Sequence, residues 1–314
     1  MTTATANKIG RAAVRAANSI VNLAVLVVIL LLVAVAVYAI WDSDRVYRAA
    51  DAAQYAVYKP SAEEEESISF AELQAINPDV FSWLTVYGTN IDYPVTQGAN
   101  NEKYVTTDAF GKYSLSGAIF LDFMNSSDFG DFNSILYGHH MEKQTMFGEI
   151  GLFSAKTYFD DHAYGNLYYD GKNHGLEFFA FLHADAYDSG IFTPRIDGDE
   201  ARQRYLGNLL EKSRYTRDIG VTTDDHIILL STCSSDSTNG RDILVARITD
   251  ERCSDPFIVE EKGDTYWQQA SVDRQSGIWE RVPLWARIGL FAIPLLLIVC
   301  VLMNRRKRSK EQRK

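Results

Sequence analysis

Cys233 ends a short apolar run, Leu229-Leu230-Ser231-Thr232-Cys233, of the kind that forms a buried strand. A residue at a strand end is rigidly held and can still face a cleft, which suits catalysis. The chemistry that a cysteine offers there is nucleophilic attack, and this requires the thiolate. The residues that follow, Ser234, Ser235 and Asp236, supply no positive charge. A basic partner must therefore come from another part of the chain.

Two histidines follow a second apolar run, directly after Gly138. A histidine acts as general base and general acid near neutral pH. Since His139 and His140 are adjacent, they point different ways from a strand or turn, and we expect only one of them to face a given cleft. Taken alone, the pair is also typical of a solvated surface turn. A metal site is a weaker interpretation, because the pair lacks helical i, i+4 spacing and has no cysteine pair nearby.

Arg241 opens another apolar run, eight residues after Cys233. If the strand that ends at Cys233 and the strand that begins at Arg241 are neighbours, the guanidinium lies near the sulfur. A fixed cation there would hold a substrate carbonyl or a developing oxyanion. Arg247 is the competing candidate, since strand alternation puts it on the same face as Arg241, although a structural role accounts for it equally simply. Together the three patterns predict a cysteine–histidine–arginine site.

The elements that would position these residues are mostly short strands, because runs rich in β-branched and aromatic residues alternate with turn residues. The runs are Trp83–Val86, Ile91–Val95, Ala118–Asp122, Ser134–Tyr137, Leu176–Ala184, His226–Thr232 and Ile243–Ile248. Apolar residues at helical spacing indicate one amphipathic helix, Asp199–Arg214. The capping-box pair Ser69 and Glu72 predicts a short helix, and Met146–Phe153 a turn or two. Many short strands and few helices favour a mainly β fold, a closed or half-closed barrel with peripheral helices.

Two long apolar segments flank this body. Residues 20–41 carry no charge and are long enough to span a bilayer, and residues 284–303 carry only Arg287, near one end. Basic residues precede the first segment and follow the second, so the positive-inside rule places both termini in the cytoplasm. A cleaved signal peptide is the alternative for the first segment, but its apolar run is longer than the usual run of about 7–15 residues.

This topology divides the chain into parts with distinct roles. They are a cytoplasmic basic tail (1–19), a transmembrane helix (20–41), a stalk helix (42–67), the globular domain (68–255), a linker (256–283), a second transmembrane helix (284–303) and a second basic tail (304–314). The net charge is −10 although both tails are basic, so the extracytoplasmic body is strongly acidic. Such a body is a poor partner for nucleic acid, whereas the tails suit anionic lipid. No calcium-binding loop pattern occurs, and we expect no metal.

From Phe70 to Ile248 the chain resembles the class B sortases. Sortases carry an L-x-T-C motif followed by an arginine at a strand start, which is similar to Leu230-Ser231-Thr232-Cys233 and Arg241. Their histidine motif resembles Tyr137-Gly138-His139-His140-Met141, and this correspondence puts the acid–base residue at His139. Other similar segments are Ile76-Asn77-Pro78-Asp79-Val80, Ile91-Asp92-Tyr93-Pro94-Val95, Gly117-Ala118-Ile119-Phe120-Leu121-Asp122, Met146-Phe147 and the helix over residues 199–214.

The resemblance implies a sortase-type barrel of about eight strands and a membrane-bound transpeptidase of Gram-positive bacteria. Cys233 would attack the Thr carbonyl of an LPxTG-like or NPxT-like sorting signal and form a thioacyl enzyme. His139 would protonate the leaving amine, Arg241 would stabilise the oxyanion, and Ser231 and Thr232 would contact the substrate. The partners implied are secreted proteins that carry the signal. The acceptor implied is the amine of a lipid-linked cell-wall precursor or a pilin lysine. The resemblance implies no cofactor.

Two alternatives and one question stay open at this point. Cys233 and Cys253 both fall outside the cytoplasm, where disulfides form, so a bridge in a non-catalytic adhesin or sensor ectodomain is one alternative. A cysteine peptidase that only hydrolyses its acyl-enzyme is the other, and its sequence would look the same. A second span is more typical of the pilin-polymerising class C sortases, so the sequence leaves open whether the acceptor belongs to the cell wall or to a pilus.

Overall fold

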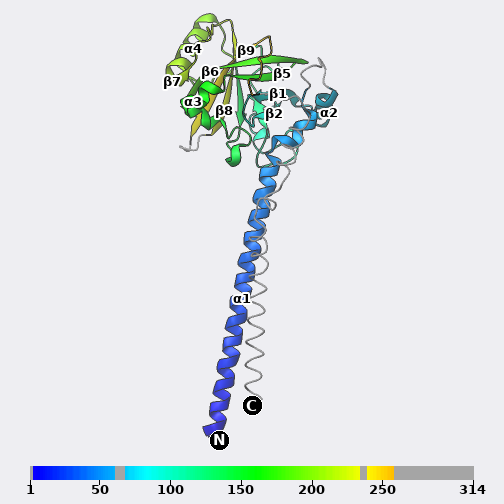
Figure 1. The fold of residues 1–314 in the computed structure, drawn as a ribbon, viewed down its shortest axis with the longest axis vertical. Helices are drawn as coiled ribbons and strands as arrows, with labels where there is room; N and C mark the ends of the chain where they lie inside the picture. Colours follow the sequence, from blue (N-terminus) through cyan, green and yellow to red (C-terminus); the bar gives the residue numbers. More distant parts are fainter. Residues whose placement is uncertain (1–2, 61–67, 234–238, 258–314) are drawn as a thin grey trace. The chain divides into compact units, whose positions relative to one another are not determined.

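The computed structural model describes residues 3–60, 68–233 and 239–257 (Figure 1). The chain begins with a long helix, α1 (Thr3–Ala49), which contains the expected span 20–41. Among the described residues, α1 is the one helix long and apolar enough to cross a membrane. Its large apolar side chains are exposed, as they would be against lipid. The second expected span, 284–303, lies outside the described residues.

The segment between α1 and the strands is a series of short helices. Asp51 caps η1 (Ala52–Tyr58), its carboxylate accepting a hydrogen bond from the amide of Ala53 at 2.9 Å. Within the described part of the expected stalk, residues 42–60, the end of α1 and η1 are helical, and residues 61–67 of the expected stalk lie outside the described residues. The next helix, α2 (Ile68–Ile76), begins at Ile68, so Ser69 lies inside its first turn. The prediction of Ser69 as the N-cap is therefore wrong, because Ser69 is the second residue of α2. The Ser69 hydroxyl lies 3.4 Å from the carbonyl oxygen of Lys59.

Eight strands form a closed barrel, as the resemblance implied. In spatial order they are β5-β1-β2-β3-β4-β8-β9-β6, and pairing of β5 with β6 closes the ring. A ninth strand, β7, adds to the edge at β6. The pairs β2–β3 and β4–β8 are parallel and the others antiparallel. The strands are β1 (Val80–Val86), β2 (Asp92–Thr96), β3 (Ile119–Leu121), β4 (Asn133–Gly138), β5 (Tyr164–Tyr169), β6 (Lys172–Asp185), β7 (Ser213–Thr216), β8 (His226–Cys233) and β9 (Gly240–Thr249).

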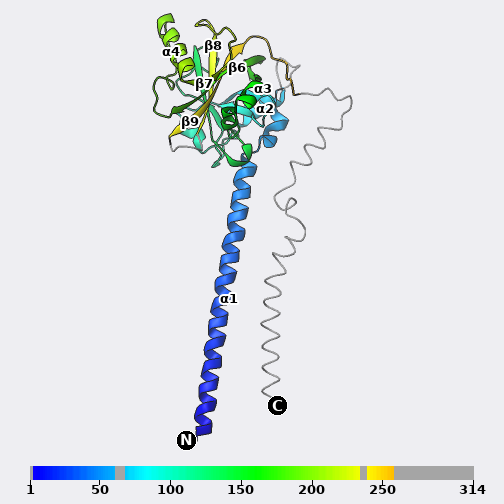
Figure 2. The ribbon, with the colours of Figure 1, turned by 60° about the vertical axis from the view of Figure 1, so that its left-hand side comes forward.

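The strands β4, β8 and β9 are buried on both faces. Leu230 and Leu244 belong to the cluster that fills the barrel, together with Leu136, Ile228 and Ala246. The alternate residues Leu229 and Ile243 belong to a second cluster outside the barrel, with Ile135, Ile227 and Val245. Helix α4 (Asp199–Lys212) covers this outer cluster with Tyr205, Leu206 and Leu209 (Figures 1 and 2). Burial of both faces explains why these strands read as continuous apolar runs.

The seven strands expected from the sequence are all present, and two further strands were not predicted. β5 contains Gly165 and Asn166, which have low strand propensity. Its link to β6 is an Asp170–Gly171 turn with positive φ at both residues, a common hairpin signal. The expected helix 199–214 ends at Lys212 instead, because β7 begins at Ser213.

The short helices outside the barrel were predicted only in part. The expected turns over Met146–Phe153 correspond to η4 (Ile150–Ser154), since the residues before Ile150 are not helical. α3 (Lys156–Asp161), η2 (Lys103–Val105) and η3 (Glu142–Gln144) were not expected.

Candidate active site

The ends of three neighbouring strands bring the predicted cysteine, histidine and arginine into one row. β4 and β8 are parallel, and their pairing runs as far as Gly138 with Thr232. The next residues along the chain are His139, directly after the end of β4, and Cys233, the last residue of β8. On the other side of β8, Cys233 pairs directly with Arg241 at the start of β9. Because neighbouring strands lie about 4.8 Å apart, the three backbone positions span roughly 10 Å.

Strand alternation assigns this row to the outer face of the barrel. Residues two apart along a strand share a face. Position 139 therefore shares the face of Ile135, position 233 that of Leu229, and position 241 that of Ile243, all three in the outer cluster. A cysteine–histidine–arginine site was predicted on the condition that these strands are neighbours. The pairing of β8 with β4 and with β9 meets this condition.

The two histidines face different ways, as expected. His139 is partly exposed, and its Nε2 lies 2.8 Å from the carbonyl oxygen of Val105. His140 has a buried Nδ1 with no hydrogen-bond partner in the described part of the chain. A methyl group added at Gly151 would lie 3.9 Å from His140 Cε1 and 3.4 Å from an oxygen of Asp242. His140 therefore lies near Asp242, which directly follows Arg241 but shares the inner face of Leu244, opposite to the face of the row.

Gly138 is required by the packing beneath His139. A Cβ atom at this position would lie 2.6 Å from Ile119 Cδ1 and 2.7 Å from Phe147 Cδ2. These contacts are shorter than van der Waals contact allows, so the strand end sits directly on the apolar core. The amide of Phe147 also donates to the carbonyl of His139 at 3.0 Å. The loop that follows His139 is thus closed onto the histidine itself.

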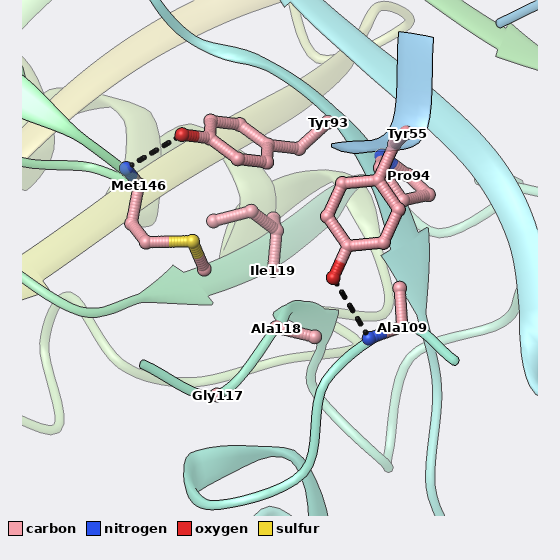
Figure 3. Close-up of a pocket in the computed structure, with 8 residues that line it drawn as sticks. All are labelled: Tyr55, Tyr93, Pro94, Ala109, Gly117, Ala118, Ile119 and Met146. Carbon is pink, nitrogen blue, oxygen red and sulfur yellow. Dashed lines mark hydrogen bonds between the residues drawn. The ribbon is translucent and has the colours of Figure 1, made fainter. Parts of the chain in front are cut away.

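Tyr93 holds the far end of this loop. It is 2% exposed, and its hydroxyl accepts a hydrogen bond from the amide of Met146 and donates one to the carbonyl of Ala50, both at 2.9 Å. Figure 3 shows the Tyr93 phenol directed at Met146 beside a small, mainly apolar hollow. Since Ala50 directly follows α1, one phenol connects the end of α1 to the histidine loop. Tyr93 was not among the residues that the sequence predicted to belong to the site.

Arg241 is partly exposed and lies close enough to Tyr137 to affect it electrostatically. Burial and the nearby Asp122 carboxylate raise the pKa of Tyr137 well above its usual value, while Arg241 acts in the opposite direction. The Tyr137 hydroxyl donates to Asp122 at 3.1 Å. Tyr137 precedes His139 by two residues, so it belongs to the same face of β4 and flanks the row. The alternating pattern of β4 could have identified it.

The predicted substrate contacts, Ser231 and Thr232, are both 1% exposed. Neither hydroxyl has a hydrogen-bond partner within the described residues. By alternation Ser231 shares the outer face with the row, whereas Thr232 shares the inner face of Leu230. The two adjacent hydroxyls therefore lie on opposite faces of β8.

Arg247, the competing arginine, lies far from the row. It pairs across the sheet with Ile227, six residues along β9 from Arg241, which is roughly 20 Å. Its Nε donates to a carboxylate oxygen of Glu177 at 2.9 Å, and a second carboxylate, Asp225, lies 3.8 Å from its guanidinium. Its role is structural, the alternative that the sequence left open.

A disulfide between Cys233 and Cys253 is excluded by the backbone. Cys253 is a free thiol whose sulfur lies 3.8 Å from the carbonyl of Leu176, and Leu176 pairs with Ile248. Ile248 is seven residues along β9 from Arg241, the partner of Cys233, and therefore roughly 23 Å away. A disulfide needs Cα atoms within about 7 Å. Burial raises the pKa of the Cys253 thiol, which makes it a poor nucleophile.

Residues 3–60, 68–233 and 239–257 contain no group of three or more histidine, cysteine, aspartate or glutamate side chains placed to hold a metal ion. The arrangement that the fold does provide is a cysteine position flanked on one side by a histidine and on the other by an arginine. Such a set can perform nucleophilic acyl transfer, with one group for the proton and one for the oxyanion.

No family model matches the chain. It is 32% identical to "Sortase B" of Staphylococcus aureus over 183 residues, which are 57% of this chain and 74% of that protein. It is 30% identical to "Sortase B" of Listeria monocytogenes over 182 residues, covering 56% and 72% of the two chains.

Among solved structures, the fold is similar to sortase B from the type II pilus of Streptococcus pneumoniae. The TM-score is 0.52 and the identity 48%, over 58% of this chain and 99% of that one. It is also similar to a Streptococcus pyogenes class B sortase involved in pilus biogenesis, with a TM-score of 0.53 and 38% identity over 58% and 98% of the two chains.

Proposed function

Because the chain belongs to the class B sortases, which are cysteine transpeptidases, we propose that Cys233, His139 and Arg241 form its catalytic site. The observation that carries this proposal is the row of strand ends: β8 pairs Cys233 with Arg241, and β4 brings His139 alongside it. No other cysteine in the described residues has such neighbours, since Cys253 lies near Leu176 at the opposite end of β9.

In the acylation half-reaction, the Cys233 thiolate attacks the carbonyl carbon of the Thr residue in the sorting signal. A C–S bond forms, and the carbonyl π electrons move to oxygen, where the guanidinium of Arg241 balances the negative charge. As the tetrahedral intermediate collapses, the C–N bond breaks and protonated His139 gives its proton to the leaving amine. The products are the thioacyl enzyme and the cleaved C-terminal peptide. Of the two hydroxyls, we assign substrate contact to Ser231, because Thr232 serves the inner face of β8.

In the second half-reaction, an incoming amine attacks the thioester carbonyl. Neutral His139 accepts the proton of that amine, the C–S bond breaks, and Cys233 leaves as the thiolate. We propose a pilin lysine as this amine, in preference to a cell-wall precursor. The support is the similarity to two sortases of pilus systems, one of them at 48% identity over almost its whole length. The substrate is then a secreted protein with an LPxTG-like or NPxT-like signal.

We further propose that the enzyme is a two-pass membrane protein with both termini in the cytoplasm. The domain boundaries are those set out above, with spans at 20–41 and 284–303 and the catalytic domain at 68–255. Support comes from the apolar exposed surface of α1 and from the basic residues at both ends of the sequence. This arrangement would hold the catalytic row close to the extracellular face of the cell membrane, where secreted substrates emerge.

A hydrolytic peptidase and a non-catalytic adhesin are the competing functions. The adhesin hypothesis rested on a Cys233–Cys253 bridge, which the separation of the two residues along β9 removes. The peptidase hypothesis shares every residue of the proposed site, so only the fate of the thioacyl enzyme separates it from a transpeptidase.

The test uses the full-length protein in detergent micelles with fluorogenic peptides of both signal types. Each is incubated with a lysine peptide, with an oligoglycine amine, or with no amine, and products are identified by mass spectrometry. A thioacyl adduct on Cys233 that transfers to the lysine peptide is expected. Hydrolysis at the same rate whichever amine is present would favour the peptidase. Cleavage that survives Cys233→Ala would refute the assigned nucleophile.

A further inference from the structure

The imidazole of His139 is bound to a backbone carbonyl, and this contact determines where its proton sits. Its Nε2 lies 2.8 Å from the oxygen of Val105. A carbonyl oxygen only accepts hydrogen bonds, so Nε2 must be the protonated nitrogen. In the neutral imidazole, Nδ1 is then the nitrogen with the free lone pair. We propose that the turn around Val105 is a positioning device that fixes the His139 tautomer, so that Nδ1 exchanges protons with the reacting amines.

This inference rests on the proposed role of His139 and adds the group that orients it. An acid–base histidine that works beside a nucleophile needs a third group to hold its ring and its tautomer. In many enzymes a carboxylate does this. Within the described residues, Val105 is the hydrogen-bond partner of the His139 ring. The backbone carbonyl thus takes the place that a carboxylate occupies elsewhere, without adding a negative charge.

The Val105 carbonyl is held by the preceding residue, Tyr104. Tyr104 is fully buried, and its hydroxyl donates to Asp79 at 2.7 Å and accepts from the side-chain amide of Asn77 at 3.1 Å. Its own carbonyl accepts from the amide of Ala118 at 3.0 Å. Tyr104 is thereby fixed at both ends, so the next peptide group has little freedom to turn.

Charged and capping groups support the same turn from the solvent side. Lys103 donates to Asp79 at 2.6 Å, and the side-chain oxygen of Asn100 accepts from the amides of Glu102 and Lys103. Although burial opposes it, hydrogen bonds from Lys103 and Tyr104 hold the pKa of Asp79 below its usual value. Asp79 therefore stays ionised and keeps both bonds at physiological pH.

Gly117 leaves the space that the turn needs. Its φ is +59°, and a Cβ atom there would lie 2.4 Å from the oxygen of Tyr104 and 2.7 Å from the oxygen of Val105. Any side chain would push the Val105 carbonyl away from its present position. Two motifs singled out in the sequence thus surround this turn: Asn77 and Asp79 bind the hydroxyl of Tyr104, and Gly117 leaves room for the carbonyl of Val105.

The test measures the tautomer directly by long-range ¹H–¹⁵N correlation spectra of full-length, ¹⁵N-histidine-labelled protein in micelles, at a mildly alkaline pH where an imidazole is neutral. His139→Gln assigns the signals. The wild type is expected to show His139 protonated on Nε2. Gly117→Ala and, more mildly, Tyr104→Phe are expected to give a mixture of tautomers. Gly207→Ala is the matched control, because a methyl group there meets no atom within 4 Å.

Kinetics supply the second readout. Displacing a catalytic group by about 1 Å can lower the rate roughly 100-fold, so Gly117→Ala should lower kcat by about 10- to 100-fold and change KM little. If Gly117→Ala does not fold, Tyr104→Phe carries the test. His139 protonated on Nδ1 in the wild type, or an unchanged tautomer in a folded Gly117→Ala, would overturn the proposal. The spectrum does not depend on turnover, so failure of the proposed transpeptidase would appear separately, as absence of a Cys233 adduct.

Discussion

Tyr93→Phe removes one oxygen atom from the centre of the connection between α1 and the histidine loop. In the wild type this hydroxyl bonds the amide of Met146 and the carbonyl of Ala50, at 2.9 Å each. Both residues are buried, Ala50 at 0% and Met146 at 2% exposure. Phenylalanine keeps the ring and its packing, so the substitution isolates the two hydrogen bonds. The amide and the carbonyl would be left buried without a partner.

The cost follows from leaving these two groups unsatisfied. An unpaired buried polar group costs about 1–3 kcal/mol, and some relaxation toward solvent is expected because η3 lies at the surface. We therefore expect a loss of roughly 2–4 kcal/mol in the free energy of unfolding. For a domain of this size, 1 kcal/mol corresponds to about 2–4 °C, so Tm should fall by about 4–16 °C. The loss should be local as well, because Met146 has a positive φ of 53° that the bond helps to hold.

Thermal melts followed by circular dichroism and hydrogen exchange of the Met146 amide would measure the two effects. Tyr168→Phe is the matched control, since Tyr168 is 4% exposed and its hydroxyl has no hydrogen bond within the described residues. That control should change stability by less than about 0.5 kcal/mol. If Tyr93→Phe is as stable as Tyr168→Phe and the Met146 amide keeps its protection, the phenol does not link α1 to the loop.

Three further predictions concern charged groups, two of them away from the row and one, Arg241, within it. Burial raises the pKa of Glu149, although hydrogen bonds from Asn90 oppose the shift, so the folded state binds this proton more tightly than the unfolded chain. Its contribution to stability is then complete below a pH of about 4 and is lost as pH rises through the folded pKa. In urea titrations, the stability of the wild type relative to Glu149→Gln should therefore fall between pH 4 and pH 7, and a rise would contradict the assignment. Arg247→Ala should lower the free energy of unfolding by about 1–3 kcal/mol through loss of its bonds to Glu177 and leave kcat unchanged. Arg241→Ala should instead lower kcat by roughly 100- to 1,000-fold, and equal kinetic effects of the two substitutions would refute the separation of their roles.

The strands could be predicted where burial on both faces makes their sequence a continuous apolar run. Runs such as Ser134–Tyr137 and His226–Thr232 are apolar on both faces, because the barrel interior and α4 cover them from either side. β5 was missed since its residues around Gly165 resemble a loop, and it is a strand because β1 and β6 pair with it on both sides. The predicted helix includes the first two residues of β7, Ser213 and Arg214, because a strand of four residues is too short for its period to show in the sequence.

The sequence singles out the cysteine, the histidine and the arginine as candidates because each lies at the end or the start of an apolar run. Their spatial order was predictable only on the condition that their strands are neighbours, and sheet order is a property of the whole chain. The same limit explains why Arg247 competed with Arg241: alternation gives the face of a residue, but only the register shows that Arg247 pairs with Ile227 and not with Cys233.

The group that binds His139 could not have been found by its residue type, because any amino acid carries a backbone carbonyl. Val105 itself is exposed, and its side chain has no role in the contact. The sequence does show the residues that restrict the Val105 carbonyl oxygen to one position. Gly117 is such a residue, since its missing Cβ makes room for the oxygens of Tyr104 and Val105. The backbone group that binds His139 is therefore indicated in the sequence by the residues around it, Gly117 and Tyr104. A substitution at Gly117 should change the tautomer of His139 more than a substitution at Val105.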